Sequence, residues 1–181
     1  TNDNMGSCDG TFRFEALYDT VECLPGAVYM KDLSGNYING NNYLVNTISG
    51  FSELSDLVGL DDWGLMNAMS GRWNPKFVDS ICQDDKEVIT TGVPVRDKLE
   101  LPFLDVSGRV IAQSSSKFPL QDKQGRLCGL FGYSLDSTDN MDFVTLRQLY
   151  WQLYSNKKEA DTAFMCHYFG QDFAHEYAVT S

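Results

Sequence analysis

Basic residues are few in this chain. Lys and Arg together number 14 against 25 Asp and Glu, so the formal net charge is −11 at pH 7. Nucleic-acid binding depends on lysine and arginine side chains that neutralise backbone phosphates. The charge balance therefore predicts that this segment does not bind nucleic acid directly.

Long apolar runs are also absent. No stretch approaches the roughly 18 consecutive apolar residues of a membrane-spanning helix, and the polar segment 1–10 lacks the apolar core of a signal peptide. We therefore expect no membrane contact and a cytoplasmic location. The chain has 181 residues, 43% of them hydrophobic, which is enough for one domain of ordinary size with extensions.

Cysteine and histidine are sparse and poorly spaced for metal binding. The cysteines are odd in number and include no Cys-x-x-Cys pair, which favours reduced thiols over a zinc site or a disulfide framework. They are Cys8, Cys23, Cys82, Cys128 and Cys166. The one metal-like group joins Cys166 to His167, His175 and Glu176, but its spacing is not that of a ligand set. We expect no bound metal.

Motifs for catalysis are missing as well. The sequence has no Gly-x-Ser-x-Gly, no phosphate-binding loop and no dinucleotide-binding glycine pattern. Asp61 and Asp62 form a carboxylate pair beside Trp63, but neighbours on a loop more often cap a helix or face solvent. Cys82 lies on the apolar face of an expected helix without a nearby base, which is typical of a small core residue. We therefore predict that the chain is not an enzyme.

Hydrophobic spacing predicts a hairpin followed by helices. Residues 26–33 and 37–38 read as two short strands joined by the turn-forming sequence Asp-Leu-Ser-Gly-Asn. Apolar residues three and four positions apart then predict helices over 43–48, 52–58 and 75–91. Pro75 suits the first turn of the long helix, and Gly92 follows it as a stop signal.

The apolar period changes to two after the long helix. Leu99, Leu101 and Phe103 alternate with other residues, and segments 110–117 and 127–135 follow after two glycine-containing turns. Three antiparallel strands added to the front hairpin give an α+β fold with a five-stranded antiparallel sheet. The helices, which lie between strands two and three in the sequence, should cover one face of the sheet and leave a cavity beneath them.

Residues 24–138 resemble the PAS family. The resemblance rests on "LPGAVYMKDLSGNYINGNN", on "DDKEVITTGVPV" and on "SKFPLQDKQGRLCGLFGYSLDST", in that order. Residues 136–138 are similar to the Asp-Ile-Thr end signal of the family, with Ser137 in place of Ile. The resemblance implies an N-terminal extension over 1–24 with an amphipathic helix, a PAS domain over 25–138, and a C-terminal helical extension over 139–181.

The resemblance also implies a role. It is closest to PAS domains of bacterial sensor kinases and of regulators with a C-terminal helix-turn-helix. We therefore expect a cytoplasmic sensory and dimerisation module of a signal-transduction or transcription-regulatory protein, with a kinase or helix-turn-helix output domain outside this sequence. The sequence itself shows no phosphoacceptor motif and no complete helix-turn-helix.

Strand parity assigns residues to the cavity once one position is fixed. In flavin-binding relatives the positions matching Phe103, Gln113 and Ser134 point at the ligand. Because side chains two residues apart on a strand share a face, further residues should also point toward the cavity, namely Leu99, Leu101, Ile111, Ser115, Lys117, Leu130 and Gly132. We expect a small organic ligand there, bound by Leu101, Phe103, Gln113, Ser115, Lys117 and Ser134. Lys117 either neutralises a ligand carboxylate or reaches the rim.

An alternative reading has no ligand. In it Gln113, Ser115 and Ser134 pair with one another inside a filled core, and the domain serves protein–protein interaction and dimerisation alone. Neither flavin nor haem is expected in either case. Light-sensing relatives carry a reactive cysteine where this chain has Gly59–Leu65, and haem-binding relatives place a histidine on the long helix, whereas His167 and His175 lie beyond it.

The opposite face of the sheet is apolar and predicts a dimer. Parity turns Phe131, Tyr133 and Leu135 to that face, together with Val110 and Ala112, and such a surface is rarely left in water. Phe14, Leu17 and Val21 form a stripe within residues 12–24 that would cover it. The resemblance places such an N-terminal helix at a dimer interface, so we expect a homodimer.

Helical spacing continues in the tail. Apolar residues from Phe143 to Tyr154 recur at helical intervals, and an aromatic-rich second helix is expected over 157–177. The tail is either a signalling helix that leads to an output domain or a cap packed on the module. We expect it to be dispensable for folding.

Overall fold

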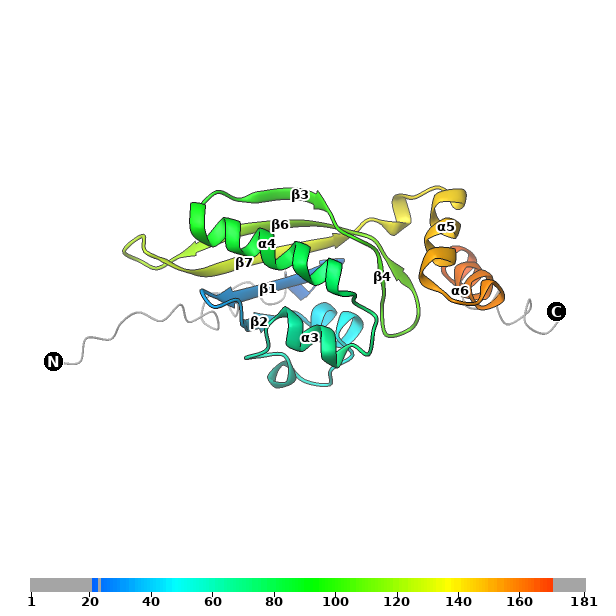
Figure 1. Cartoon of the computed structure of the whole chain (residues 1–181), viewed down its shortest axis with the longest axis horizontal. Helices are drawn as coiled ribbons and strands as arrows, with labels where there is room; N and C mark the ends of the chain where they lie inside the picture. Colours follow the sequence, from blue (N-terminus) through cyan, green and yellow to red (C-terminus); the bar gives the residue numbers. More distant parts are fainter. Residues whose placement is uncertain (1–20, 23, 171–181) are drawn as a thin grey trace.

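The structure is a computed structural model, which describes residues 21–22 and 24–170 (Figure 1). Its main feature is an antiparallel sheet of five strands in the order β2-β1-β7-β6-β3. The strands are β1 (Gly26–Asp32), β2 (Tyr37–Gly40), β3 (Val95–Leu99), β6 (Gln113–Gln121) and β7 (Leu127–Asp136). The prediction of an α+β fold with a five-stranded antiparallel sheet is confirmed.

The elements between β2 and β3 lie against one face of this sheet, as predicted (Figure 1). They are the π-helix η1 (Tyr43–Ile48), the 3-10 turn η2 (Leu54–Asp56), and the helices α3 (Asp62–Ala68) and α4 (Pro75–Thr91). The long helix has the predicted bounds because Asn74 caps its first turn through the N–H of Phe77, and Gly92 ends it with φ of 70°. The helix expected over 52–58 is only the short η2, and α3 was not predicted.

One short hairpin stands apart from the main sheet. It consists of β4 (Phe103–Leu104) and β5 (Val110–Ile111), which pair only with each other. The prediction of one continuous alternation through Leu99, Leu101 and Phe103 is therefore wrong. Pro102, which has no N–H to donate, interrupts it, and β3 ends at Leu99.

The interruption inverts the parity expected for β3. Lys98 pairs with Ser115, and Leu99 pairs with Ser114. Paired residues share a face, so Lys98 lies on the cavity side and Leu99 on the other. Leu99 is 67% exposed and Leu101 is 44% exposed, so neither lies in the cavity. By contrast, Ile111 and Leu130 are buried in the main core, where parity placed them.

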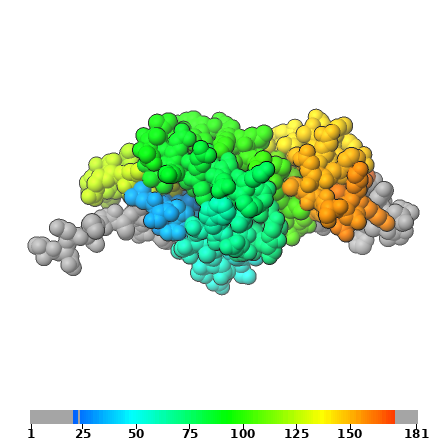
Figure 2. Space-filling view, viewed as in Figure 1, coloured from blue at the N-terminus to red at the C-terminus, as the bar shows by residue number. Residues whose placement is uncertain are grey.

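The C-terminal tail forms a helical cap, defined here as α5 (Phe143–Leu153) and α6 (Lys157–Phe169), which follow the short turn η3 (Thr138–Asn140). The cap makes a lobe at one end of the molecule (Figures 1 and 2). Leu146, Tyr150 and Phe164 build a second apolar core with Val110 of β5. These contacts favour the packed cap over a free signalling helix, and they place Val110 under the cap instead of under an N-terminal helix.

The outer face of the sheet is partly covered within the same chain. Val21 packs with Val28 and Met30, and Phe131 and Tyr133 lie half-buried beside them. Leu135 is 37% exposed. The proposed interface residues Phe14 and Leu17 lie outside the described residues. No helix in the described part of the chain is long and apolar enough to cross a membrane.

Candidate ligand-binding site

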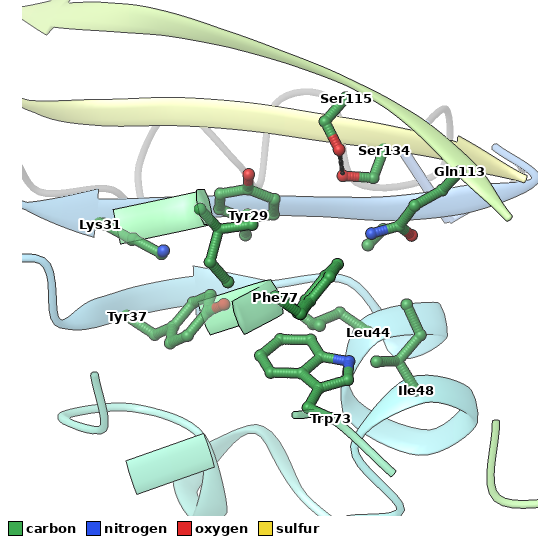
Figure 3. Close-up of a pocket in the computed structure, with 12 residues that line it drawn as sticks. Tyr29, Lys31, Tyr37, Leu44, Ile48, Trp73, Phe77, Gln113, Ser115 and Ser134 are labelled. Atoms are coloured by element: carbon green, nitrogen blue, oxygen red, sulfur yellow. Dashed lines mark hydrogen bonds between the residues drawn. The ribbon is translucent and has the colours of Figure 1, made fainter. Parts of the chain in front are cut away.

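A pocket of about 350 Å³, its open mouth included, lies between the sheet and the helices (Figure 3). Its apolar wall comes from β1, β2, η1, α4 and the segment before α4. The apolar and aromatic lining residues are Ala27, Tyr29, Tyr37, Leu44, Ile48, Trp73, Phe77 and Ile81. The polar lining residues are Lys31, Gln113, Ser115 and Ser134. The pocket thus joins an apolar body to a few placed polar groups, which is the usual composition of a small-molecule site.

Aromatic contacts fix one wall of this pocket. The ring of Trp73 lies 4.8 Å from that of Phe77, centroid to centroid. Phe103 of β4 is 2% exposed, and its ring lies 5.9 Å from Trp73 and 5.5 Å from Phe77. Phe103 therefore supports the wall from behind and does not line the pocket. Interlocked rings of this kind hold their positions well.

Three of the predicted ligand-binding residues meet at the pocket. The hydroxyl oxygens of Ser115 and Ser134 lie 2.7 Å apart and share a hydrogen bond (Figure 3). Gln113 is 6% exposed, yet its Oε1 has no hydrogen-bond partner among the described residues. The buried Nε1 of Trp73 also has no hydrogen-bond partner among the described residues. The alternative of internal pairing therefore holds for the serines and fails for the carbonyl oxygen of Gln113.

A buried charge cluster adjoins the pocket at the end marked by Lys31 (Figure 3). It consists of Lys31, Asp62, Asp85 and Lys117. The Nζ of Lys31 lies 2.6 Å from both Asp62 Oδ2 and Asp85 Oδ2. The Nζ of Lys117 lies 2.6 Å from Asp85 Oδ1 and donates to the carbonyl of Ile81 at 2.9 Å. Two cations thus face two anions, and the cluster is neutral as a whole.

The charge cluster ties the sheet to the helices. Lys31 belongs to β1 and Lys117 to β6, whereas Asp62 begins α3 and Asp85 lies in α4. All four side chains are at most 7% exposed. Buried charges of this kind must be paired, because removing one partner strands the other charge away from water.

In the charge cluster, the neighbouring opposite charges affect the pKa values of Lys31 and Asp85 more than burial does. Burial lowers the pKa of Lys31, but the carboxylate of Asp62 and further neighbours raise it more, so the pKa stands well above the usual value. Burial raises the pKa of Asp85, but Lys31 and Lys117 lower it more, so the net shift is downward. Both groups are therefore ionised at neutral pH.

Tyr37 and Cys82 complete the surroundings of Asp62. The hydroxyl of Tyr37 donates to Asp62 Oδ1 at 2.7 Å, and burial, with Asp62, raises the pKa of Tyr37 well above its usual value. Cys82 Sγ lies 3.7 Å from Asp62 Oδ2. Burial, with the Asp62 charge, raises the pKa of Cys82 to about 11. Cys82 is therefore a protonated thiol at neutral pH, in keeping with its predicted role as a small core residue.

Most of the charge cluster was not predicted from the sequence. Asp61 caps α3 through the N–H of Gly64 at 2.7 Å, as expected of the Asp61–Asp62 pair, but Asp62 is buried. Lys117, placed either on a ligand carboxylate or at the rim, has Asp85 as its partner instead. One feature of the sequence could have indicated the charge cluster. A lysine within the apolar run of β1 indicates a buried charge that needs a partner.

The described cysteines include both free thiols and a disulfide-bonded residue. Cys82 and Cys166 are free, whereas Cys128 is disulfide-bonded. The expectation of reduced thiols is therefore wrong for Cys128, because widely spaced cysteines can meet across a fold. Cys8, Cys23, His175 and Glu176 lie outside the described residues. Within the described ranges, no three acidic, cysteine or histidine side chains gather in a way that could hold a metal.

Comparisons with known proteins place the fold. No protein-family model and no curated protein matches the sequence. A Vibrio cholerae VqmA dimer in the absence of target DNA is 23% identical, with 71% of this chain and 52% of that chain covered and a TM-score of 0.57. VqmA bound to DPO is 20% identical, with 93% and 77% covered and a TM-score of 0.53. The PAS domain of a Colwellia psychrerythraea protein is 15% identical, with 70% and 98% covered and a TM-score of 0.48. This chain therefore spans about half the length of the first VqmA chain.

Proposed function

The chain has the fold of the PAS family, and from this premise we propose that it is a sensory module of a signal-transduction or transcription-regulatory protein. Its signal is a small organic molecule that binds in the pocket between α4 and the sheet. The observation that carries the proposal is the pocket lining, in which apolar and aromatic side chains surround a few polar ones, among them Gln113, whose buried carbonyl oxygen has no partner in the described part of the chain.

The pocket has the composition that this role needs. It lies between α4 and the sheet and is lined by eight apolar or aromatic and four polar residues, a composition typical of small-molecule sites. Aliphatic and aromatic side chains together supply most of its wall, and the polar groups are few. A ligand would satisfy Gln113 and would withdraw its own apolar surface from water, so both effects favour binding.

The known structures suggest the first compound to test. One similar VqmA structure holds DPO, and another concerns DNA binding by LuxR-type receptors. Each statement belongs to VqmA. We extend to this chain only the proposal that its ligand is of comparable size and that its output lies in a helix-turn-helix or kinase domain.

A homodimer and a cytoplasmic location complete the proposal. The half-buried Phe131 and Tyr133 and the more exposed Leu135 form an apolar strip on the outer sheet face, which a second copy would cover. The net charge of −11 supports an absence of direct nucleic-acid contact by this segment. The mutual pairing of the buried acids and lysines supports the absence of enzymatic activity.

The β4–β5 hairpin is the proposed route from the pocket to the cap. One side of it presents Phe103 to the pocket wall, and the other side presents Val110 to the cap. The hydroxyl of Tyr150 in α5 accepts the N–H of Val110 at 3.1 Å. Arg72 donates to the carbonyl oxygens of Ile48, which lines the pocket, and of Leu104 in β4. A shift of the aromatic wall would therefore reach the cap through directly packed groups.

A second candidate function is interaction without a ligand. The hydrogen bond between Ser115 and Ser134 favours it, because these two hydroxyls are already satisfied by each other. In that case the domain would dimerise and relay contacts from partner proteins alone.

Melting experiments with DPO separate the two functions. If DPO binds, a concentration of 100 times its dissociation constant should stabilise the protein by about 2.7 kcal/mol, seen as a higher melting temperature. Ser115→Phe should remove this rise because the new ring occupies the pocket, whereas Ser114→Ala on the opposite face should keep it. A library of small metabolites extends the test, and a flat response to every compound would favour the interaction module.

A further inference from the structure

A chain of hydrogen bonds joins the β4–β5 hairpin to both helices of the cap. The N–H of Val110 in β5 donates to the hydroxyl oxygen of Tyr150 in α5 at 3.1 Å. That hydroxyl oxygen lies 2.5 Å from Nδ1 of His167 in α6. Tyr150 is 0% exposed and the side chain of His167 is 6% exposed, so water has little access to these bonds. We call these three residues the latch triad.

The latch triad requires a neutral imidazole with an unprotonated Nδ1. Tyr150 has a single hydroxyl proton, and its oxygen already accepts from Val110. Nδ1 of His167 is the hydrogen-bonding atom paired with that hydroxyl, so it must accept the proton with its lone pair. The ring proton of the neutral imidazole is therefore on Nε2.

The charged groups around His167 come from β7, η3 and the turn before β5. Nε2 of His167 lies 3.5 Å from Oδ1 of Asp139 and has no hydrogen-bond partner among the described residues. The same oxygen lies 3.1 Å from Arg109, whose guanidinium also contacts Asp136 at 2.6 Å. A positive charge on His167 would therefore lie near a cation that already pairs with both carboxylates. Burial, with Arg109, lowers the pKa of His167, although Asp139 and Asp136 act in the opposite direction.

Protonation of His167 is incompatible with the latch triad. An imidazolium carries a proton on both ring nitrogens, so Nδ1 can no longer accept from Tyr150. The buried hydroxyl proton would then have no acceptor, and such an unpaired donor costs free energy. Opening of the cap at α6 removes both this cost and the repulsion from Arg109, because the ring then reaches water.

We propose that His167 is a pH-sensitive switch, which holds the cap on the β4–β5 hairpin when it is neutral and releases the cap when it is protonated. The same hairpin carries Phe103, whose ring lies 5.9 Å from that of Trp73 in the pocket wall. Acidification therefore weakens the contact between the hairpin and the cap on the proposed route from the pocket. The switch needs no bound ligand, so it adds a second signal, the proton, to the proposed function.

Exchange of the Val110 amide with solvent deuterium, followed by NMR, tests the switch in the full chain. In the open state the ring is in water with the ordinary histidine pKa of 6.5, so each unit of pH below that value favours opening about tenfold. Protection of the Val110 amide, corrected for the intrinsic exchange rate, should therefore fall about tenfold between about pH 7.5 and 5.5. Amides of β6 and β7 in the main sheet serve as the internal reference.

The two histidines of the chain allow a matched pair of variants. His167→Asn places an amide oxygen near the position of Nδ1 and does not titrate in this range, so Val110 protection should no longer depend on pH. His175→Asn removes the other histidine and should leave the tenfold fall unchanged. A fall that persists in His167→Asn, or that disappears in His175→Asn, would overturn the assignment to His167.

The wild-type ring gives a readout that does not depend on any variant. Its NMR titration should have a midpoint below pH 6.5, because the closed cap binds the proton less tightly than the open one. A midpoint at or above pH 6.5, or constant Val110 protection from pH 7.5 to 5.5, would overturn the switch. Neither result bears on ligand binding, which the melting experiments with DPO test separately.

Discussion

Removing the carboxylate of Asp85 should destabilise the fold strongly. Asp85 is the one residue of the charge cluster that contacts both lysines, at 2.6 Å each. In Asp85→Asn, Lys31 keeps Asp62, but Lys117 keeps only the carbonyl of Ile81. Breaking a buried pair in this way costs about 3–5 kcal/mol, a large part of a total stability of about 5–15 kcal/mol.

The neighbouring residue offers a matched control. Asp84 also lies in α4 and also contacts a lysine at 2.6 Å, but the side chain of its partner Lys98 is 36% exposed. Asp84→Asn should therefore cost about 1 kcal/mol or less. In urea unfolding, the two variants should differ by at least about 2 kcal/mol. Thermal melts should place Asp85→Asn about 6–20 °C below the wild type, at roughly 2–4 °C per kcal/mol.

Two further results would refute the reasoning. Equal losses in the Asp85 and Asp84 variants would show that burial does not control the cost. In the double variant Asp85→Asn/Lys117→Met the stranded charge is gone, so its stability should exceed that of Asp85→Asn alone. A simple sum of the two single losses would contradict the pairing. Because the pKa of Asp85 is lowered in the fold, its contribution should be present above pH 3.8 and lost as the pH falls further.

Four other predictions follow from the cap, the pocket and the outer face. Burial, with the Arg109 charge, lowers the pKa of His167 below 6.5, so the contribution of this group to stability should be lost as the pH falls below 6.5, and hydrogen exchange in α6 should rise there. A chain that ends at Thr138 exposes the second core, so it should aggregate or lose its cooperative melt; an unchanged melt would restore the expectation that the tail is dispensable. In Gly132→Ala the new methyl group would lie 2.4 Å from the ring of Tyr29, so the ring should move into the pocket and weaken ligand binding, and unchanged affinity would place the ligand elsewhere. Tyr133→Asp should weaken dimerisation in sedimentation runs, and an unchanged dimer would show that the outer face is not the interface.

Local sequence signals were sufficient for most of the sheet and for the long helix. Pro75 and Gly92 mark the true ends of α4, and period-two segments mark β6 and β7. These signals are reliable because they act within a few residues of one another. They could not show that the alternation before Phe103 belongs to two different sheets, because pairing partners are set by tertiary contacts.

The candidate site was predictable only in part. The family resemblance indicated Gln113 and Ser134, and strand parity added Ser115; the structure brings all three to the pocket. Neither signal could identify Trp73, because it lies in an irregular segment before α4. Neither could show that Lys117 of β6 pairs with Asp85 of α4. Leu101 was misplaced because parity was carried through a break in the strand.

Native mass spectrometry tests the central claim most directly. Freshly purified protein is measured under native and under denaturing conditions, beside Ser115→Phe. The account predicts that the wild type carries the additional mass of a small organic molecule in the native spectrum alone, and that Ser115→Phe, still folded, lacks it. Equal native and denatured masses for the wild type, unchanged after incubation with DPO, would contradict ligand sensing by this pocket.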